Sequence, residues 1–291
     1  MFSQALTART DRIARHFETV FLFTKNDIRT TLIPVTIFAL SATPKYDPVH
    51  AWNAPLWIWF HLLQFNIANQ IQDPEEDRKN KPSRPIPAGR ISVDSAADMR
   101  WVMVPVCLLL SLWYGTQAVL ASTVFAALSI WYNELGGDKM GLSKNVLTAI
   151  LYGCLEVGGT VAGSPDSCID MAGALAAALS STIYATTLHA QDFKDEEGDR
   201  LTGRRTLPTM FPKAARFSMM FGLPLWAYAL SRIWKTDALS TTAFVFYSAF
   251  VGTRFVMYKT VGDDKQSCKF YSLWHSLGHL LPGYWRFFYG V

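Results

Sequence analysis

The stretch VLTAILYGCLEVGGTVAG, residues 146–163, decides the fold class. It contains a single ionisable side chain, Glu156, and has the length of a membrane-crossing helix, for which about 17–25 mainly apolar residues are needed. Similar stretches lie at residues 27–42, 55–70, 99–114, 116–132, 171–190, 217–233, 239–257 and 271–289. None of them alternates as a membrane barrel strand does. We therefore predict an all-α, polytopic membrane protein with nine transmembrane helices.

The composition agrees with a membrane protein. Half of the 291 residues are hydrophobic and 14% are aromatic, whereas 17% are charged, against roughly 25% in a typical soluble chain. This composition excludes a disordered chain, a collagen and a coiled coil, and a net charge of +4 without a basic helix face does not indicate nucleic-acid binding. The four cysteines show no C-x-x-C spacing, so neither a zinc site nor a disulfide framework is indicated.

The distribution of positive charge predicts the orientation. With nine crossings, all but four of the 27 Lys and Arg residues fall on the side of the amino terminus; the four exceptions are Lys45, Arg232, Lys235 and Arg286. The positive-inside rule then places the amino terminus in the cytosol and the carboxyl terminus outside. Residues 1–25 are basic and amphipathic and are expected to form a surface helix on the membrane. Residues 1–291 are predicted to form a single domain.

Two polar, acidic segments interrupt the apolar chain on the predicted cytosolic side. Residues 69–90 read NQIQDPEEDRKNKPSRPIPAGR, and residues 189–208 read HAQDFKDEEGDRLTGRRTLP. Oxygen-bearing side chains recur in them at the spacing of one helix face, namely Asn69, Asp73 and Asp77, and Asp192, Asp195 and Asp199. Pro74 forbids a straight helix through the first set, which therefore requires a kink or a helix restart.

This residue set has the chemistry of a magnesium diphosphate site. Carboxylate and amide oxygens are the ligands that Mg²⁺ accepts, and phosphate oxygens usually complete its coordination. Basic side chains in the same segments could neutralise the remaining phosphate charge; they are Lys81, Arg84, Arg90, Arg204 and Arg205. Solvated loop charges and salt bridges explain either segment alone, but they do not explain why the pattern occurs twice on one side.

At these residues the sequence resembles the UbiA superfamily of intramembrane prenyltransferases. The family motifs are N-x-x-x-D-x-x-x-D after the second helix and an Asp-rich motif after the sixth, and NQIQDPEED and DFKDEEGD stand at those places. The resemblance implies a helical bundle around a central cavity, capped by helical cytosolic loops, in which two or more Mg²⁺ ions hold an isoprenyl diphosphate. It implies that Asn69, Asp73 and Asp77 bind one ion and that Asp192, Asp195 and Asp199 bind another.

The same resemblance suggests further diphosphate contacts. Arg84, Lys144 and Asn145 match the family positions for this role. The family often has a basic residue soon after the Tyr at the end of the fourth helix, but here Asn133 and Glu134 follow Tyr132.

The expected reaction begins with ionisation of the substrate, and two fates of the resulting cation stay open. The nearest likeness is to fungal UbiA-type terpene cyclases, which favours cyclisation of farnesyl diphosphate to a sesquiterpene. Transfer of the isoprenyl group to an aromatic or quinone-precursor acceptor is the alternative. The expected partners are the isoprenyl diphosphate and the bilayer, with no nucleic acid and no obligatory protein partner. The fungal likeness also suggests the endoplasmic reticulum, with the active-site loops facing the cytosol.

A few polar residues inside the predicted spans are candidates for the cavity. Glu156 could steer a carbocation or accept a proton, or it could be a structural hydrogen-bonding group paired with an interior Tyr, His or Arg. Tyr152 could stabilise a cation through its ring, and His189 could orient Asp192. His275 and His279 share a helix face, for which packing and hydrogen bonding are favoured over a metal site. A transporter is the competing class, but transporters place coupling residues near the midplane rather than at one edge.

Overall fold

The computed structural model describes residues 2–72, 74–139, 141–203 and 205–290. Over these residues the elements are helices, and no strand occurs among them. The long helices after the amino-terminal helix are α2 Ile33–Ala42, α4 Asn53–Gln72, α6 Val93–Leu112, α7 Thr116–Asn133, α8 Gly141–Gly163, α9 Met171–Thr187, α12 Pro212–Ile233, α13 Ala238–Met257 and α14 Val261–Tyr289. The short ones are α3 Pro48–Ala51, α5 Pro74–Asn80, α10 Glu196–Thr202 and α11 Leu207–Met210.

The all-α prediction is confirmed, and each predicted span overlaps one of the long helices. The spans 27–42 and 171–190 also include 3₁₀ or π-helical turns, at residues 27–32 and 188–190. Among the described residues, three stretches have the length and apolarity to cross a membrane, Val93–Leu112, Ser143–Gly163 and Met171–Arg200. Large apolar side chains also face outward from the bundle, among them Leu109 on α6, Leu225 on α12 and Phe246 on α13. Crossing by all nine helices stays a prediction.

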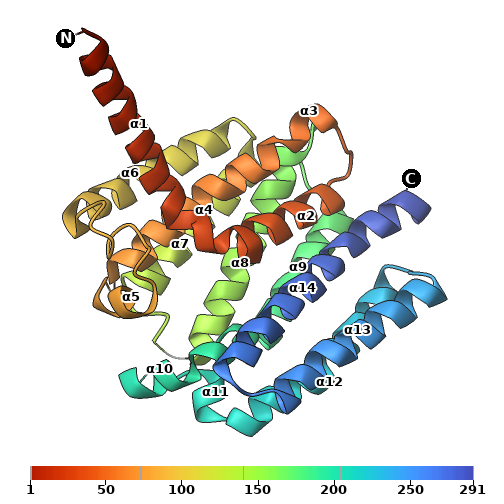
Figure 1. The fold of residues 1–291 in the computed structure, drawn as a ribbon. Coiled ribbons are helices and arrows are strands. Elements are labelled where there is room, and N and C mark those ends of the chain that lie inside the picture. The colour runs from red at the N-terminus through yellow and green to blue at the C-terminus, as the bar shows by residue number, and fades with distance from the viewer. Residues whose placement is uncertain (1, 73, 140, 204, 291) are drawn as a thin grey trace.

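The long helices pack side by side into one bundle (Figure 1). Helix α4 packs against both α6 and α8. Helix α14 packs along α2, and α12 packs along α13. The loops with α5 and α10 lie at one end of the bundle, and the turn between α12 and α13 lies at the other, beside the carboxyl terminus (Figure 1). Both acidic segments are therefore carried to the same end.

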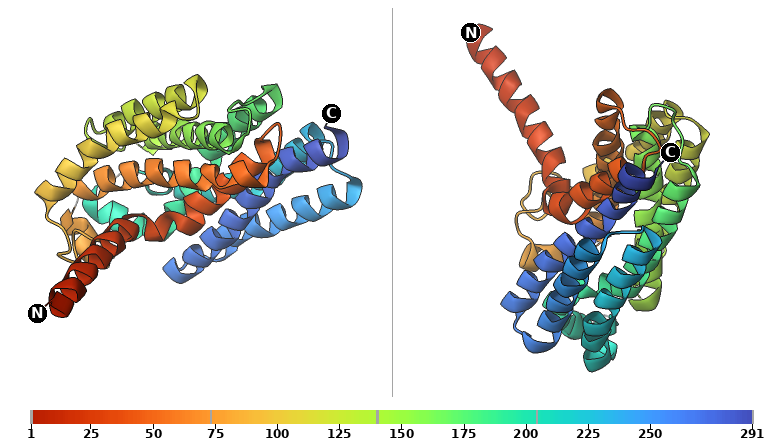
Figure 2. Two further views of the ribbon diagram at one scale, coloured as in Figure 1. Left: turned by 90° about the horizontal axis from the view of Figure 1, so that it is seen from above. Right: turned by 90° about the vertical axis from the view of Figure 1, so that its right-hand side faces the viewer.

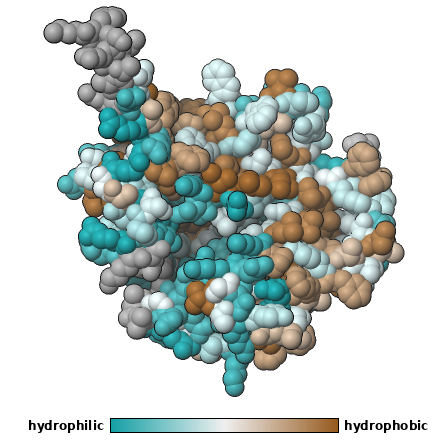
Figure 3. Space-filling view, in the orientation of Figure 1, coloured by the Kyte–Doolittle hydropathy of each residue, from teal (hydrophilic) through white to brown (hydrophobic). Residues whose placement is uncertain are grey.

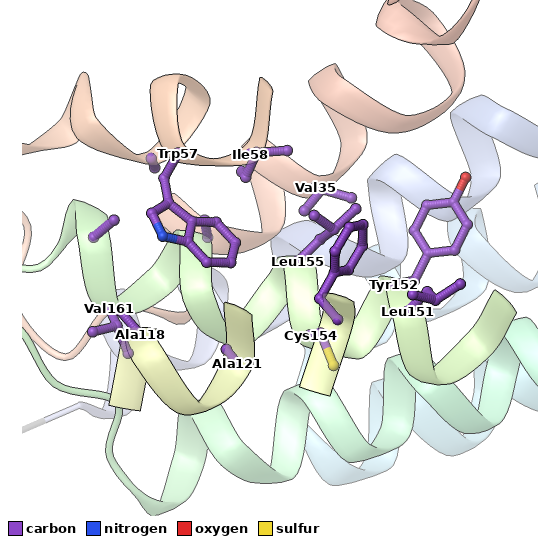
Figure 4. Close-up of a cluster of buried hydrophobic side chains, with 14 of the residues drawn as sticks. Val35, Trp57, Ile58, Ala118, Ala121, Leu151, Tyr152, Cys154, Leu155 and Val161 are labelled. Carbon is purple, nitrogen blue, oxygen red and sulfur yellow. The ribbon is translucent and has the colours of Figure 1, made fainter. Parts of the chain in front are cut away.

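Close contact between α4 and α8 forms the centre of one core (Figure 4). Trp57 is fully buried, and a Cβ atom added at Gly158 would lie 2.0 Å from its ring. Only a glycine at this position lets the indole lie against the α8 backbone. The Trp57 Nε1 donates to Ser111 Oγ at 2.9 Å, so the one polar atom of the ring is satisfied inside the core.

The amino-terminal helix α1, Phe2–Thr24, projects from the bundle (Figures 1 and 2). Ile13, Phe17 and Phe21 are exposed and lie one turn apart on it. A short 3₁₀ turn, η1 Lys25–Asp27, and a π-helical turn, η2 Ile28–Leu32, connect α1 to α2. Residues 2–24 are thus helical, and the amphipathic membrane-surface helix expected for residues 1–25 stays a prediction.

Candidate active site

The first acidic motif lies where α4 ends and α5 begins. Gln72 is the last described residue of α4 and Pro74 the first described residue of α5. The kink or helix restart expected at Pro74 falls on the residue between them, which lies outside the described residues, and stays a prediction. Asn69 donates its side-chain N–H to Asn133 Oδ1 at 3.4 Å, a bond that uses the amide nitrogen and not the carbonyl oxygen. Asp73 lies outside the described residues, so its place in the motif stays a prediction.

A polar cavity of about 360 Å³ adjoins this motif. Its wall comes from the first acidic segment and from the segment between α7 and α8, and consists of Asn69, Gln72, Asp77, Lys81, Arg84, Asn133, Glu134, Gly136, Asp138 and Lys139. Figure 3 shows hydrophilic residues gathered around a hollow on the side that carries α5 and α10. The wall mixes carboxylates with cations, as a site for a metal-bound polyanion requires.

Asp77 and Arg84 form an ion pair in this wall. Arg84 Nη1 donates to Asp77 Oδ1 at 2.8 Å and to Oδ2 at 2.6 Å. The Nε of Arg84 is buried and has no hydrogen-bond partner within the described part of the chain. Arg84 therefore holds the motif carboxylate and keeps a donor that an anion could engage.

The second motif repeats this arrangement from another pair of elements. Lys144 Nζ donates to Asp192 Oδ1 at 2.6 Å, which joins the start of α8 to the segment after α9. The neighbouring Asn145 is 1% exposed, and its side-chain Nδ2 has no partner among the residues that the structure describes. An unsatisfied buried donor beside a lysine is suited to a phosphate oxygen.

The backbone of the second motif differs from the expected regular α-helix. Residues Leu188–Gln191 and Phe193–Asp195 form two 3₁₀ turns, η3 and η4, and α10 begins only at Glu196. Asp192 lies between these turns, Asp195 is exposed, and Asp199 is buried within α10. The expectation of one continuous α-helical face is therefore wrong here. The two 3₁₀ turns carry the side chains of His189 and Phe193, which are both buried against neighbouring elements.

Arg216 on α12 anchors this second segment. Its guanidinium pairs with Asp264 through two hydrogen bonds of 3.0 and 2.9 Å and donates to the Phe255 carbonyl oxygen at 2.8 Å. The same guanidinium lies over the Phe193 ring at 4.4 Å and approaches Glu196 Oε2 at 3.7 Å. No local sequence pattern signals this role, because the partners come from four other elements.

Lys81 lies within electrostatic reach of both motifs. Desolvation and the neighbouring Arg84 guanidinium lower the pKa of Lys81, whereas Asp77 and Asp195 act in the opposite direction. Asp77 belongs to the first segment and Asp195 to the second, so the two segments converge around this lysine. Arg204, the other basic candidate after the second motif, lies outside the described residues.

The described residues do not form a ready-made metal cluster. Within residues 2–72, 74–139, 141–203 and 205–290 there is no group of three or more His, Cys, Asp or Glu side chains placed to hold an ion. Asp77 and Asp192 are instead each neutralised by one cation, Arg84 and Lys144. Carboxylate and amide oxygens are suitable ligands for Mg²⁺. The basic side chains of Arg84 and Lys144, now paired with Asp77 and Asp192, could bind a phosphate group instead.

Sequence reasoning missed several residues near the cavity. Lys139 supplies a basic side chain to the cavity wall, although the position just after Tyr132 lacks one. Asp138 and Glu134 line the same wall, and Glu134 is held by Arg100 at 3.2 Å. These three residues lie in the polar segment after the fourth predicted span, and that position is the sequence feature that could have indicated them.

Asp27 was also missed, because it marks the start of a predicted span. It accepts a hydrogen bond from Asn66 Nδ2 at 2.9 Å and lies within electrostatic reach of Arg84, Lys81 and Lys194. It is thus a further carboxylate among the basic side chains of both motifs.

The three interior candidates occupy different places. Tyr152 stacks on Tyr184 with ring centroids 4.0 Å apart, inside the bundle. Glu156 is fully buried deeper in α8, in hydrogen-bonding contact with Ser180. His189 is turned toward α12, where its Nε2 donates to the Ala215 carbonyl oxygen at 3.2 Å. His189 therefore anchors the segment that carries Asp192.

Residues 31–276 match the UbiA prenyltransferase family, and the chain belongs to that family. It is 30% identical to the fumagillin beta-trans-bergamotene synthase of Aspergillus fumigatus over 91% of each chain. It is also 26% identical to a polyprenyl transferase of Hericium erinaceus, over 72% of this chain and 74% of the relative. A UbiA homolog from Archaeoglobus fulgidus bound to GPP and Mg²⁺ shares the fold, with a TM-score of 0.65 and 15% identity over 90% of this chain and 99% of that one.

Family membership gives the general class of reaction and of location. Proteins of this family are integral membrane enzymes that use isoprenyl diphosphates, as terpene cyclases or as prenyltransferases. The outward apolar side chains and the polar cavity at one end of the bundle agree with that class.

Proposed function

We propose that this chain is a Mg²⁺-dependent membrane terpene cyclase that ionises farnesyl diphosphate and cyclises the resulting carbocation to a sesquiterpene. The observation that carries the proposal is the repeated pairing of a motif carboxylate with a base, Asp77 with Arg84 and Asp192 with Lys144. A buried donor without a partner among the described residues accompanies each pair, Arg84 Nε for the first and Asn145 Nδ2 for the second. Carboxylates for a metal and donors for an anion thus occur together twice.

The residues proposed to hold the metal are the six of the two motifs, Asn69, Asp73, Asp77, Asp192, Asp195 and Asp199. Bound Mg²⁺ supplies charge neutralisation that makes diphosphate a better leaving group. Arg84 and Lys144 are proposed to bind the diphosphate oxygens when the carboxylates change partners, with Asn145 as a neutral donor. Lys81, Lys139 and Arg204 add positive potential at the same mouth and stabilise the charge that develops on the leaving group.

Ionisation leaves an allylic cation that has to be kept from water. The interior below Asn145 is lined by rings, with Tyr152 and Tyr184 stacked between α8 and α9. Aromatic faces attract a cation, and a dry interior slows its capture by water. The 30% identity to a bergamotene synthase over nearly the full chain supports cyclisation as the fate of the cation. The likeness to a polyprenyl transferase keeps transfer to an aromatic or quinone-precursor acceptor as the second candidate.

We also propose that the chain is a single domain in the endoplasmic reticulum membrane with the amino terminus and both motifs in the cytosol. The support is the separation of charge: α5 and α10 lie at one end of the bundle, and the turn between α12 and α13 lies at the other (Figure 1). Most Lys and Arg residues belong to the first end, as the positive-inside rule expects for a cytosolic face.

Incubation of the detergent-solubilised protein with Mg²⁺ and farnesyl diphosphate is expected to release diphosphate and a hydrocarbon without any acceptor. Geranyl and geranylgeranyl diphosphates in parallel give the preferred chain length, and chelation of Mg²⁺ is expected to stop both products. Diphosphate is measured enzymatically, and the hydrocarbon is identified by gas chromatography with mass spectrometry. A product that appears only when an aromatic acceptor is added would establish the transferase instead.

A further inference from the structure

A buried polar cluster lies deeper in the bundle than the motifs. Glu156 on α8, Ser180 on α9 and His279 on α14 meet there, and each is at most 4% exposed. Ser180 Oγ donates to Glu156 Oε1 at 2.6 Å, and His279 Nε2 lies 3.2 Å from the same oxygen. Buried ionisable groups within a membrane bundle are costly, so they are retained where they serve a function.

The contacts fix how many protons the pair holds. His279 Nδ1 lies 2.9 Å from the Pro34 carbonyl oxygen, which can only accept, so Nδ1 carries a proton. Nε2 lies 3.2 Å from Glu156 Oε1 and 3.1 Å from Ser180 Oγ, and the hydroxyl proton of Ser180 is directed to Glu156. One further proton between Nε2 and Oε1 avoids two facing lone pairs. The pair is either carboxylic acid with neutral imidazole or carboxylate with imidazolium. Its net charge is zero in both forms, which makes its burial tolerable.

Acceptor atoms remain unused around this pair. Glu156 Oε2, the Tyr184 hydroxyl and both ring nitrogens of His275 are buried without a hydrogen-bond partner in the described chain. His275 stacks on Tyr184 at 3.9 Å and contacts the His279 ring at 4.5 Å. A small cavity of about 20 Å³ borders Ser180, His275 and His279, and its other walls are mainly apolar. Unsatisfied buried polar atoms carry a free-energy cost that a structural role does not explain.

The depth of the pair suits a substrate whose diphosphate is held at the motifs. Glu156 is three helical turns beyond Lys144 along α8, or about 18 Å at 1.5 Å per residue. Tyr152 lies between these two residues on the same helix. The far part of an isoprenoid chain, rather than its diphosphate, would reach this layer.

We infer that the Glu156–His279 pair is the proton acceptor that ends the reaction inside the membrane. This inference rests on the proposed function. A C–H bond next to the cationic carbon breaks, its electrons form the new C=C bond, and the proton passes to Glu156 Oε2. The positive charge thereby moves from carbon to the pair, held as carboxylic acid and imidazolium. Transfer of that proton to the released diphosphate restores the starting state.

The test uses the full-length, detergent-solubilised protein with Mg²⁺ and farnesyl diphosphate, and measures diphosphate release separately from product composition. The wild-type protein is measured first. If it forms no hydrocarbon without an acceptor, that result contradicts the proposed function and is distinguished from a failure of this inference. Glu156→Gln keeps an acceptor for Ser180 but lacks a basic carboxylate. Diphosphate release is expected to persist, while the share of the wild-type hydrocarbon falls on the order of tenfold or more in favour of alcohols or other alkenes. His279→Gln is expected to shift the products in the same direction.

The matched control is His61→Gln, because His61 is an equally buried imidazole whose nitrogens contact the Trp57 carbonyl oxygen and Ser122 Oγ, both at 2.8 Å. Its product composition is expected to match wild type. Wild-type composition in both Glu156→Gln and His279→Gln overturns the inference. Loss of diphosphate release in both folded variants also overturns it, since the pair would then act before the cation forms. Should neither variant fold, Ser180→Ala removes the hydrogen bond that positions Glu156 Oε1 and is expected to shift the products in the same direction. An unchanged composition in that variant overturns the inference as well.

Discussion

Asp192→Ala is expected to slow diphosphate release from farnesyl diphosphate by about 10²–10³-fold or more. The substitution removes a proposed metal ligand and also the carboxylate that holds Lys144 Nζ at 2.6 Å. The variant therefore loses a ligand for the metal that neutralises the leaving group, and it also loses the contact that positions the Lys144 ammonium group. The rate is measured with saturating Mg²⁺ in detergent, and unfolding of the variant is followed in parallel, so that a loss of fold is distinguished from a loss of catalysis.

Asp98→Ala is the matched control for this substitution. Asp98 is an exposed aspartate near the start of α6. It lies outside both acidic segments, and its removal is expected to leave the rate near wild type. Near-normal turnover in Asp192→Ala would contradict the assignment of the second motif, and with it the proposed site.

Arg216→Met is expected to lower the free energy of unfolding by about 3–5 kcal/mol, because it leaves Asp264 buried without its counter-ion. Asp264 is 1% exposed and receives two hydrogen bonds from the guanidinium. The Phe193 ring and the approach to Glu196 lose their anchor at the same time. Thermal or denaturant unfolding in detergent measures the change, and diphosphate release in the folded fraction is expected to fall because the second motif loses support.

Two further variants test whether the loss of stability comes from the unpaired buried charge of Asp264. Lys213→Ala removes an exposed cation from the first turn of the same helix and is expected to change stability by less than about 0.5 kcal/mol. The double variant Arg216→Met with Asp264→Leu removes both charges and is expected to recover much of the lost stability. A single Arg216→Met variant as stable as wild type would show that the buried pair does not hold the segment.

The helical class and the position of each long helix could be predicted from apolar runs, but several helix starts could not. The α14 helix begins at Val261, ten residues before the predicted span, after Thr260 accepts a hydrogen bond from the Asp263 backbone N–H. The α6 helix begins at Val93 with Ser92 as its cap, six residues before its span. These first turns are polar, so a search for apolar residues does not detect them, although capping residues mark them.

The ligand types and two of their basic partners could be recognised in the sequence, because acidic and basic residues recur within short segments. The 3₁₀ turns around Asp192 could not be predicted, because they accompany contacts of His189 and Phe193 with residues far along the chain. Lys139 was missed for a related reason: it becomes part of the cavity wall only through the fold of the segment that follows α7.

The ion pairs at the two motifs have a thermodynamic consequence. A divalent ion that arrives alone has to displace tethered cations, since Arg84 already engages Asp77 and Lys144 already engages Asp192. A diphosphate that arrives with the ion offers both displaced side chains new oxygen partners. Joint binding is therefore favoured over separate binding, and reciprocity requires each ligand to raise the affinity for the other by the same factor. Titration of Mg²⁺ with and without inorganic diphosphate measures that factor, and equal affinities would show that the tethered cations do not compete.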